Sequence, residues 1–243
     1  MNIRFYNARI LTMNQNTEIL EGEVWVEGNR ITHVGPVNVS GADSVKILEQ
    51  PIWDREIDAK GNLIMPGFKN AHTHSAMTFL RSYADDMPLL DWLNKQIFPM
   101  EAKLQGEDIY WLSRLLEYLT SGITANFDMY FHPEMIAKAS VDSGFRTVIV
   151  SSLNDFSSSL SAMEEEYQTY NNYDELIKYS LGFHAEYTTS KKLLEGVAIL
   201  SQKYKAPVFM HNSETESEVA QCVGRYGMTP TTFLDSLGMF EYG

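Results

Sequence analysis

The stretch LIMPGFKNAHTHSAMTFLR, residues 63–81, decides the fold. It begins as an apolar run of strand character, breaks at Pro66-Gly67, and then presents two histidines with one residue between them. On a strand, this spacing places the imidazoles of His72 and His74 on the same face. Two neutral imidazoles so placed can share one metal ion, and zinc or iron suits such ligands. The pattern predicts a metal site, and the alternative is two polar residues that leave a strand together.

Four further apolar runs follow, at residues 122–131, 145–153, 178–187 and 206–214, with helical patterns between them. Alternating strands and helices indicate parallel β/α units. The sequence therefore predicts an α/β fold, an incomplete (β/α)8 TIM-like barrel of about five β/α units. In such barrels the active site forms where the strands end. Polar residues gather at these ends: His72, His74, Asp128, Ser151, Ser152, His184 and His211.

Three helices between the runs have recognisable limits. Pro133 stands at a first turn and Gly144 follows the end of its helix. Ser190 can cap the helix over residues 191–204. One leucine stripe predicts a single helix over residues 107–121, which Gly122 can end.

Residues 1 to about 60 read differently, as short strands joined by turns. Gly28-Asn29 lies between two strand-like runs and indicates a hairpin. Another short strand is expected after Lys60-Gly61. This part predicts a small β-unit without catalytic residues, in which His33 is an ordinary residue of the hairpin.

Composition limits the classes of function. The formal net charge is −13 and Lys and Arg form no cluster, which argues against binding to nucleic acid or to an anionic membrane. No apolar run approaches transmembrane length, and the polar, alternating start does not read as a signal peptide. The single Cys222 excludes an internal disulfide and suits a cytoplasmic protein. A catalytic role for Cys222 is disfavoured because no histidine is near it in sequence.

His211 ends the last apolar run, and Glu214 follows three residues later. A third imidazole here can complete a metal site, with Glu214 able to move protons beside it. The alternative for Glu214 is an acidic residue that favours a helix N-terminus. His184 ends the preceding run and is expected either to contact a substrate or to be a hydrogen-bonded residue of the rim. His132 precedes Pro133, so entry into a helix and a functional role remain open.

Several motifs together resemble the amidohydrolase superfamily, and most closely its branch of 5'-methylthioadenosine/S-adenosylhomocysteine deaminases and chlorohydrolase-like enzymes. The motifs are MPGFKNAHTHSAMTFLRSYADDMPLLDWLNKQIFPMEAKL, GITANFDMYFHPE, GFHAEYTTS and PVFMHNSETESE, and the likeness covers nearly the whole chain. It implies that residues 1–62 are the N-terminal part of a β-sandwich domain. Residues 63–243 would be the N-terminal part of a metal-dependent (β/α)8 hydrolase barrel.

The resemblance also implies roles for single residues. His72, His74 and His211 match the ligands of one divalent metal ion, Zn²⁺ or Fe²⁺. Glu214 matches the acid/base that carries a proton to the ring nitrogen of the substrate, and His184 matches a histidine that contacts substrate. The implied activity is hydrolytic deamination of an adenine nucleoside or related amino-heterocycle by a metal-activated water. Glu101 matches a carboxylate that binds ribose hydroxyls, although the residues alone favour a solvated helix-start carboxylate.

The sequence also departs from this pattern. The strand-6 histidine and strand-8 aspartate of the family find no counterpart before Gly243. We therefore expect a truncated chain that is inactive alone, and association through an open barrel edge or as a homo-oligomer. Ser151 and Ser152 stand where some relatives have a carboxylate-binding arginine, and Arg81 could replace it. The alternatives are a dechlorinating or amide-cleaving hydrolase, or a non-catalytic fragment or pseudoenzyme.

Overall fold

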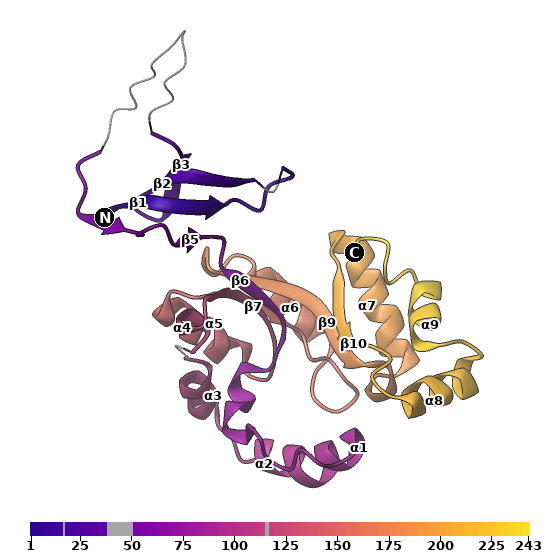
Figure 1. Cartoon of the computed structure of the whole chain (residues 1–243). Helices are drawn as coiled ribbons and strands as arrows, with labels where there is room; N and C mark the ends of the chain where they lie inside the picture. The colour runs from indigo at the N-terminus through magenta and orange to yellow at the C-terminus, as the bar shows by residue number, and fades with distance from the viewer. Residues whose placement is uncertain (17, 38–50, 115–116) are drawn as a thin grey trace. The chain divides into compact units, whose positions relative to one another are not determined.

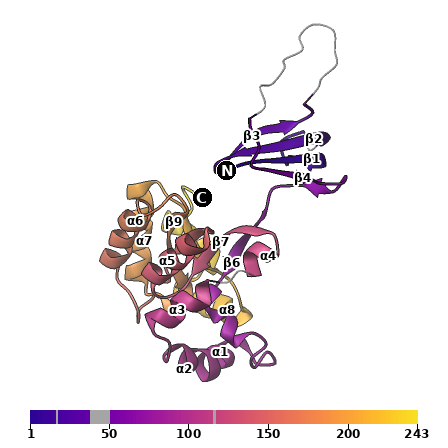
Figure 2. The ribbon, with the colours of Figure 1, turned by 90° about the vertical axis from the view of Figure 1, so that its left-hand side faces the viewer.

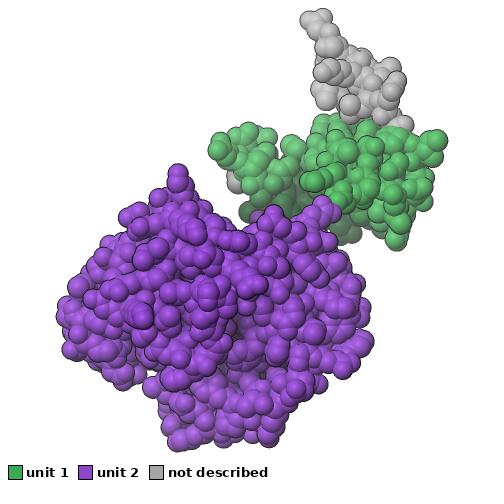
Figure 3. All heavy atoms as spheres, turned by 180° about the vertical axis from the view of Figure 1, so that it is seen from behind, with its two compact units in different colours: residues 1–67 green, residues 68–243 purple. Residues whose placement is uncertain are grey.

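The computed structural model describes residues 1–16, 18–37, 51–114 and 117–243. The chain divides into two compact units, residues 1–67 and 68–243, which Figure 3 colours separately. Each unit has its own sheet. Within the described residues, no helix has the length and apolar character needed to cross a membrane.

The first unit is built on one five-stranded sheet with the order β3-β2-β1-β4, in which β5 also pairs with β1. Strand β1 runs antiparallel to β2 and parallel to β4 and β5. A small apolar core packs on this sheet, formed by Ala8, Ile10 and Val24. The strands are β1 (Asn2–Leu11), β2 (Ile19–Glu27), β3 (Arg30–Gly35), β4 (Arg55–Asp58) and β5 (Leu63–Ile64).

The hairpin predicted at Gly28-Asn29 is confirmed, because Glu27 pairs with Arg30 and Gly28 has a φ of 63°. A left-handed conformation is one that glycine adopts without a Cβ clash. His33 Nε2 lies 3.0 Å from the carbonyl oxygen of Gly35, so this histidine belongs to the sheet. The assignment of the unit to a β-sandwich stays a prediction.

The second unit contains five parallel strands in sequential order, and this confirms an α/β fold with an incomplete TIM-like barrel of five β/α units. Figure 1 shows that the sheet is strongly curved. Because the order is sequential, the first and last strands form its two edges, and the curvature turns these edges toward each other. The strands are β6 (Phe68–Thr73), β7 (Ile123–Met129), β8 (Arg146–Val150), β9 (Ile177–Ala185) and β10 (Val208–His211).

Helices α5 (Pro133–Ser143), α6 (Leu160–Tyr170) and α7 (Lys191–Tyr204) cover one face of this sheet (Figure 2). Gly144 ends α5 with a φ of 67°, as the sequence predicts. Helices α8 (Glu216–Tyr226) and α9 (Pro230–Ser236) follow β10. The core between sheet and helices is apolar and fully buried, and includes Leu153, Met163, Leu181, Phe183, Leu194 and Val197.

Ser190 precedes α7 as expected, but its hydroxyl makes no capping hydrogen bond. The expectation of one helix over residues 107–121 is wrong. Helix α3 (Gly106–Ser113) ends before Arg114, whose ψ of 35° leaves the helical region, and α4 (Glu117–Thr120) begins later. Two positions of the predicted leucine stripe, 115 and 116, lie outside the described residues. The separate α4 places Tyr118 against the end of β6, where its hydroxyl lies 2.6 Å from Thr73 Oγ1.

A helical segment over residues 89–101 lies across the open side of the curved sheet (Figure 1). It consists of α1 (Leu89–Trp92), a wide turn η2 (Leu93–Ile97) and α2 (Phe98–Glu101). In the wide turn, the N–H of Phe98 donates to the carbonyl of Leu93. Pro99 lacks an N–H, so the regular bond to the carbonyl of Lys95 cannot form there.

Two short helices lie at strand ends, η1 (Ser75–Leu80) and η3 (Glu186–Thr188).

Candidate metal centre

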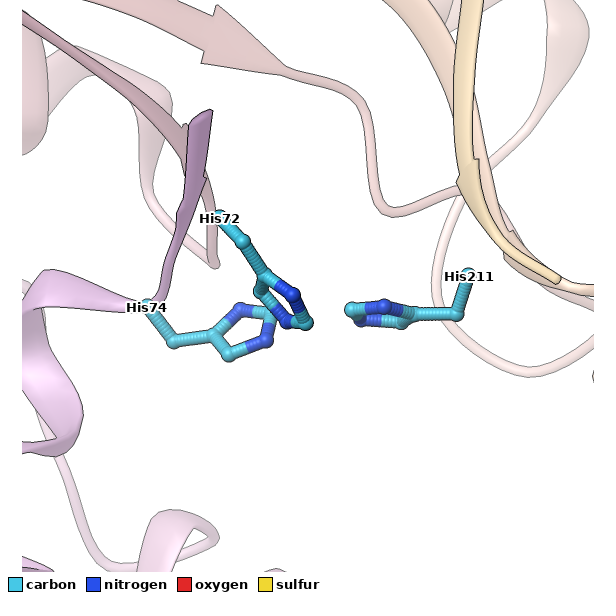
Figure 4. A group of neighbouring side chains, drawn as sticks. All are labelled: His72, His74 and His211. Carbon is cyan, nitrogen blue, oxygen red and sulfur yellow. The ribbon is translucent and has the colours of Figure 1, made fainter. Parts of the chain in front are cut away.

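The two edge strands of the curved sheet bring three histidines together. His72 lies in β6, His74 follows that strand, and His211 ends β10. Each of the three offers one ring nitrogen such that all three nitrogens lie within 4.8 Å of one another. Figure 4 shows the three rings pointing toward a common point, with centroids 5.1–5.5 Å apart. The fold therefore joins the predicted pair on β6 to a third imidazole from the opposite edge.

The tautomer of His74 is fixed by its backbone partner. Its Nδ1 lies 2.7 Å from the carbonyl oxygen of Met129, at the end of β7. A carbonyl oxygen only accepts, so Nδ1 carries the hydrogen and Nε2 keeps its lone pair. This is the arrangement in which metal-binding histidines are usually held.

Burial keeps two of the three imidazoles in the neutral form that ligates metals. Desolvation lowers the pKa of His74. Desolvation, together with the neighbouring His74, His184 and His72, lowers the pKa of His211 to about 3. Neutral imidazoles at this separation fit a divalent cation such as zinc.

A polar network beneath the site fixes the backbone that follows His74. The N–H of Ser75 donates to Asp128 Oδ1 at 2.9 Å, and Asn126 Nδ2 donates to Ser75 Oγ at 3.2 Å. The Tyr118 hydroxyl lies 3.0 Å from Ser75 Oγ. Asp128, which the sequence places at a strand end, is 1% exposed and serves this network. Because its charge has little contact with water, burial raises the pKa of Asp128 to about 6.

His184 lies beside the triad, with its ring centroid 5.2 Å from that of His211. Thr188 donates its hydroxyl hydrogen to the carbonyl of Ala185 and therefore accepts from His184 Nδ1, 3.0 Å away. The Nε2 atom of His184 thus keeps its lone pair. Desolvation, with a smaller effect of His74, lowers the pKa of His184 to about 4.

Glu214 also belongs to this site. Its Oε1 lies 3.7 Å from His211 Nδ1, and Tyr187 donates its hydroxyl to Oε2 at 3.4 Å. Desolvation raises the pKa of Glu214, and the charge of Glu218 raises it further. A carboxyl group with a raised pKa holds a proton more readily near neutral pH, which suits proton transfer.

Glu101 faces the same cavity from helix α2, contrary to the solvated carboxylate that the residues alone favour. It is 9% exposed, and Tyr130 donates its hydroxyl to Glu101 Oε1 at 2.7 Å. Desolvation raises the pKa of Glu101, while this hydrogen bond lowers it.

The cavity has a volume of about 780 Å³ and extends from the histidines to the 89–101 segment. Its walls are mostly apolar, and they include Met77, Leu89, Trp92, Leu93, Ile97 and Phe98. Ser152 lines it, whereas Ser151 is buried elsewhere. Among the described residues, neither lysine nor arginine lines this cavity. Arg81 pairs instead with Glu117 at 2.8 Å.

The remaining candidates lie away from the cavity. His132 occupies the residue before α5 and pairs with Glu134 at 2.9 Å, which is the helix-entry role. Cys222 is buried, and desolvation raises the pKa of its thiol to about 11. A neutral, buried thiol is a poor nucleophile, which agrees with the expectation that Cys222 is not catalytic.

Some residues that contact the candidate site residues could not be identified from the sequence. Tyr130 lies inside the apolar run over residues 122–131, directly after β7, and Tyr187 lies inside the GFHAEYTTS motif, but neither position carries a spacing signal of its own. The backbone carbonyl of Met129 leaves no sequence signal at all. Glu218 stands four residues after Glu214 in ETESEV, and this helical spacing is a signal in the sequence.

Comparisons with known proteins agree with this geometry. The model of the Amidohydrolase family matches residues 63–242. A 5-methylthioadenosine/S-adenosylhomocysteine deaminase of Caldicellulosiruptor saccharolyticus is 37% identical over 99% of this chain and 55% of its own length. A 5'-deoxyadenosine deaminase of Methanocaldococcus jannaschii is 39% identical over 90% of this chain and 52% of its own length. The chain thus spans about half the length of these relatives.

Among solved structures, an adenosine deaminase from Xanthomonas campestris with bound zinc superposes with a TM-score of 0.85 at 29% identity. The match covers 98% of this chain and 55% of that one. Both the strand arrangement and the small N-terminal sheet therefore have a counterpart in a zinc-containing relative.

Proposed function

The chain belongs to the amidohydrolase family, and on this premise we propose that it serves the hydrolytic deamination of an adenine nucleoside. The observation that carries the proposal is the convergence of His72, His74 and His211 at a cavity that Glu214 also lines. The names of the relatives, which are deaminases of 5-methylthioadenosine and 5'-deoxyadenosine, support this class of substrate.

We assign one divalent cation to the three histidines. Zn²⁺ is the first choice because the relative from X. campestris contains zinc, and Fe²⁺ is the second. When bound, such a cation lowers the pKa of a water molecule to about 7 and so supplies a nucleophile at neutral pH.

The side chains around the cation then have distinct tasks. Glu214 takes a proton from the water molecule and delivers it to the ring nitrogen of the substrate, which makes the amine-bearing carbon more electrophilic. The water oxygen would form the new C–O bond at that carbon. Its remaining proton would pass to the amino group, and the C–N bond would break as ammonia leaves. His184 accepts a hydrogen bond from the substrate at Nε2. Glu101 accepts hydrogen bonds from the ribose hydroxyls, since among the described residues only the bond from Tyr130, to Oε1, involves its carboxylate.

The apolar wall formed by the 89–101 segment holds the 5' substituent of the nucleoside. Burial of each apolar methyl or methylene group there contributes about 0.8 kcal/mol of binding free energy. The same wall excludes water around the reacting groups.

Because the chain spans about half the length of its relatives, the proposal is tested in a zinc-loaded protein of their full length, and residues 1–243 alone are expected to be inactive. The four substrates are 5'-methylthioadenosine, 5'-deoxyadenosine, adenosine and a chlorinated triazine. We expect ammonia from the nucleosides. Glu214→Gln should lower kcat by on the order of 10²–10⁴ with unchanged zinc content, because Glu214 moves protons and does not hold the cation. Glu216→Gln, which removes an exposed carboxylate two residues away, is the matched control. Release of chloride without ammonia, or full turnover by Glu214→Gln, would overturn the proposal.

A further inference from the structure

Glu218 is a buried carboxylate beside the site, and no task in the reaction has been assigned to it beyond the effect of its charge on Glu214. It lies in the first turn of α8 and is only 3% exposed. Its two oxygens accept two backbone hydrogen bonds, from the N–H of Ser213 to Oε1 at 3.1 Å and from the N–H of Glu214 to Oε2 at 2.7 Å. Both donors lie in the loop between β10 and α8. The carboxylate therefore holds the backbone of the residue to which we assign proton transfer.

Capping of α8 does not account for this arrangement. Thr215 is the N-cap residue, and its Oγ1 accepts from the N–H of Glu218 at 3.1 Å. The carboxylate of Glu218 instead reaches back past the cap to the two residues before it. The helix would thus keep its own cap without this carboxylate, whereas the loop would lose both of its acceptors.

The loop needs such a restraint because its backbone is strained. Ser213 has a φ of 57°, a left-handed conformation that non-glycine residues adopt at a cost of about 1–3 kcal/mol. Charge-assisted hydrogen bonds from backbone N–H groups are roughly twice as strong as neutral ones. Two such bonds at consecutive amides can hold the strained residue and fix where the Glu214 side chain starts.

We propose that Glu218 is a positioning residue, which holds the Ser213–Glu214 backbone so that the Glu214 carboxyl reaches the substrate beside His211. The inference rests on the proposed function. The contact of the Glu214 side chain with Tyr187 is long, at 3.4 Å, so the backbone contacts are the tighter restraint. A displacement of about 1 Å at a reacting group can cost 10²-fold in rate.

The test compares Glu218→Gln with Glu216→Gln in the same zinc-loaded protein of the relatives' full length. Glutamine fits the same buried volume, but its amide nitrogen cannot accept from a backbone N–H, so one of the two bonds is lost. Glu216→Gln removes the same charge from an exposed position of the same helical turn. Three quantities are measured for each variant: zinc per chain, kcat and KM for 5'-methylthioadenosine, and hydrogen exchange at the amides of residues 213 and 214.

We expect Glu218→Gln to keep its zinc and its KM within about threefold, to lose kcat by about 10–100-fold, and to exchange both amides faster. Glu216→Gln should match the wild type in all three quantities. Unchanged exchange at both amides in Glu218→Gln would overturn the inference, as would an equal loss of zinc and kcat. If the wild type releases no ammonia from any nucleoside, the proposed function fails, and the exchange measurement still decides whether Glu218 holds this loop.

Discussion

His74 donates the hydrogen on Nδ1 to the backbone carbonyl oxygen of Met129, 2.7 Å away. This one bond connects the first and second strands of the curved sheet and leaves Nε2 of His74 free to ligate. It survives any side-chain substitution at position 129 because the acceptor belongs to the backbone. The orientation of this proposed ligand thus depends on the backbone of the sheet.

The network beneath His74 predicts a dependence of stability on pH. Since burial raises the pKa of Asp128 from 3.8 to about 6, the folded state binds this proton more tightly than the unfolded state does. The contribution of Asp128 to the unfolding free energy is therefore present at low pH and is lost as pH rises through 6.

Asp128→Asn removes this titration and keeps an acceptor for the N–H of Ser75. The difference in unfolding free energy, variant minus wild type, should rise by about 2 kcal/mol from pH 4 to pH 7. Denaturant titrations of both proteins, with a chelator present, measure this difference. The histidines titrate in both proteins, so their contributions to the pH dependence cancel in the difference. A difference that does not change with pH would contradict the prediction.

The contact between Glu101 and Tyr130 predicts an effect on ribose recognition. Glu101→Gln should raise KM for 5'-methylthioadenosine more than for the free base adenine, because only the nucleoside offers ribose hydroxyls. Tyr130→Phe removes the donor at 2.7 Å and leaves the buried carboxylate less satisfied, which costs about 1–3 kcal/mol. It should shift KM in the same direction. Equal changes in KM for nucleoside and free base would show that Glu101 does not bind ribose.

Ser152 offers a test of specificity. It lines the cavity whose two carboxylates, Glu101 and Glu214, disfavour an anionic substrate group. Ser152→Arg would add a guanidinium group able to bind a carboxylate, and a hydrogen bond to a charged group contributes about 1.5–3 kcal/mol. The ratio of kcat/KM for S-adenosylhomocysteine to that for 5'-methylthioadenosine should rise by at least about tenfold. A ratio that stays the same or falls would place the substrate's 5' end away from Ser152.

Much of this architecture is readable from the sequence, since it depends on local patterns. Five apolar runs predict five parallel strands, and the H-x-H spacing predicts two imidazoles on one side of β6. That His211 joins them depends on the curvature of the whole sheet, which brings the edge strands β6 and β10 together and which no single run encodes.

Other features depend on contacts between residues far apart in the chain. The residues alone indicate an exposed Glu101, but the 89–101 segment lies over the open side of the sheet and buries it against Tyr130. The leucine stripe predicts one helix over residues 107–121, yet the hydroxyl of Tyr118 contacts the end of β6, and α4 forms as a separate element. In both cases tertiary packing overrides a local preference.

The most direct measurement of the central claim is a zinc titration, which gives stoichiometry and affinity, of four proteins: the wild type, His72→Ala, His211→Ala and His184→Ala. His184 is the matched control, since its ring lies 5.2 Å from that of His211 but its nitrogens do not belong to the group of three. The wild type should bind about one zinc ion per chain. A change in a residue beside the ligands lowers metal affinity by roughly 10–100-fold, and His184→Ala should stay within that range. His72→Ala and His211→Ala should each lose more zinc affinity than this, because they remove a ligand. Full zinc affinity in His211→Ala, or a larger loss in His184→Ala than in His211→Ala, would contradict a shared site.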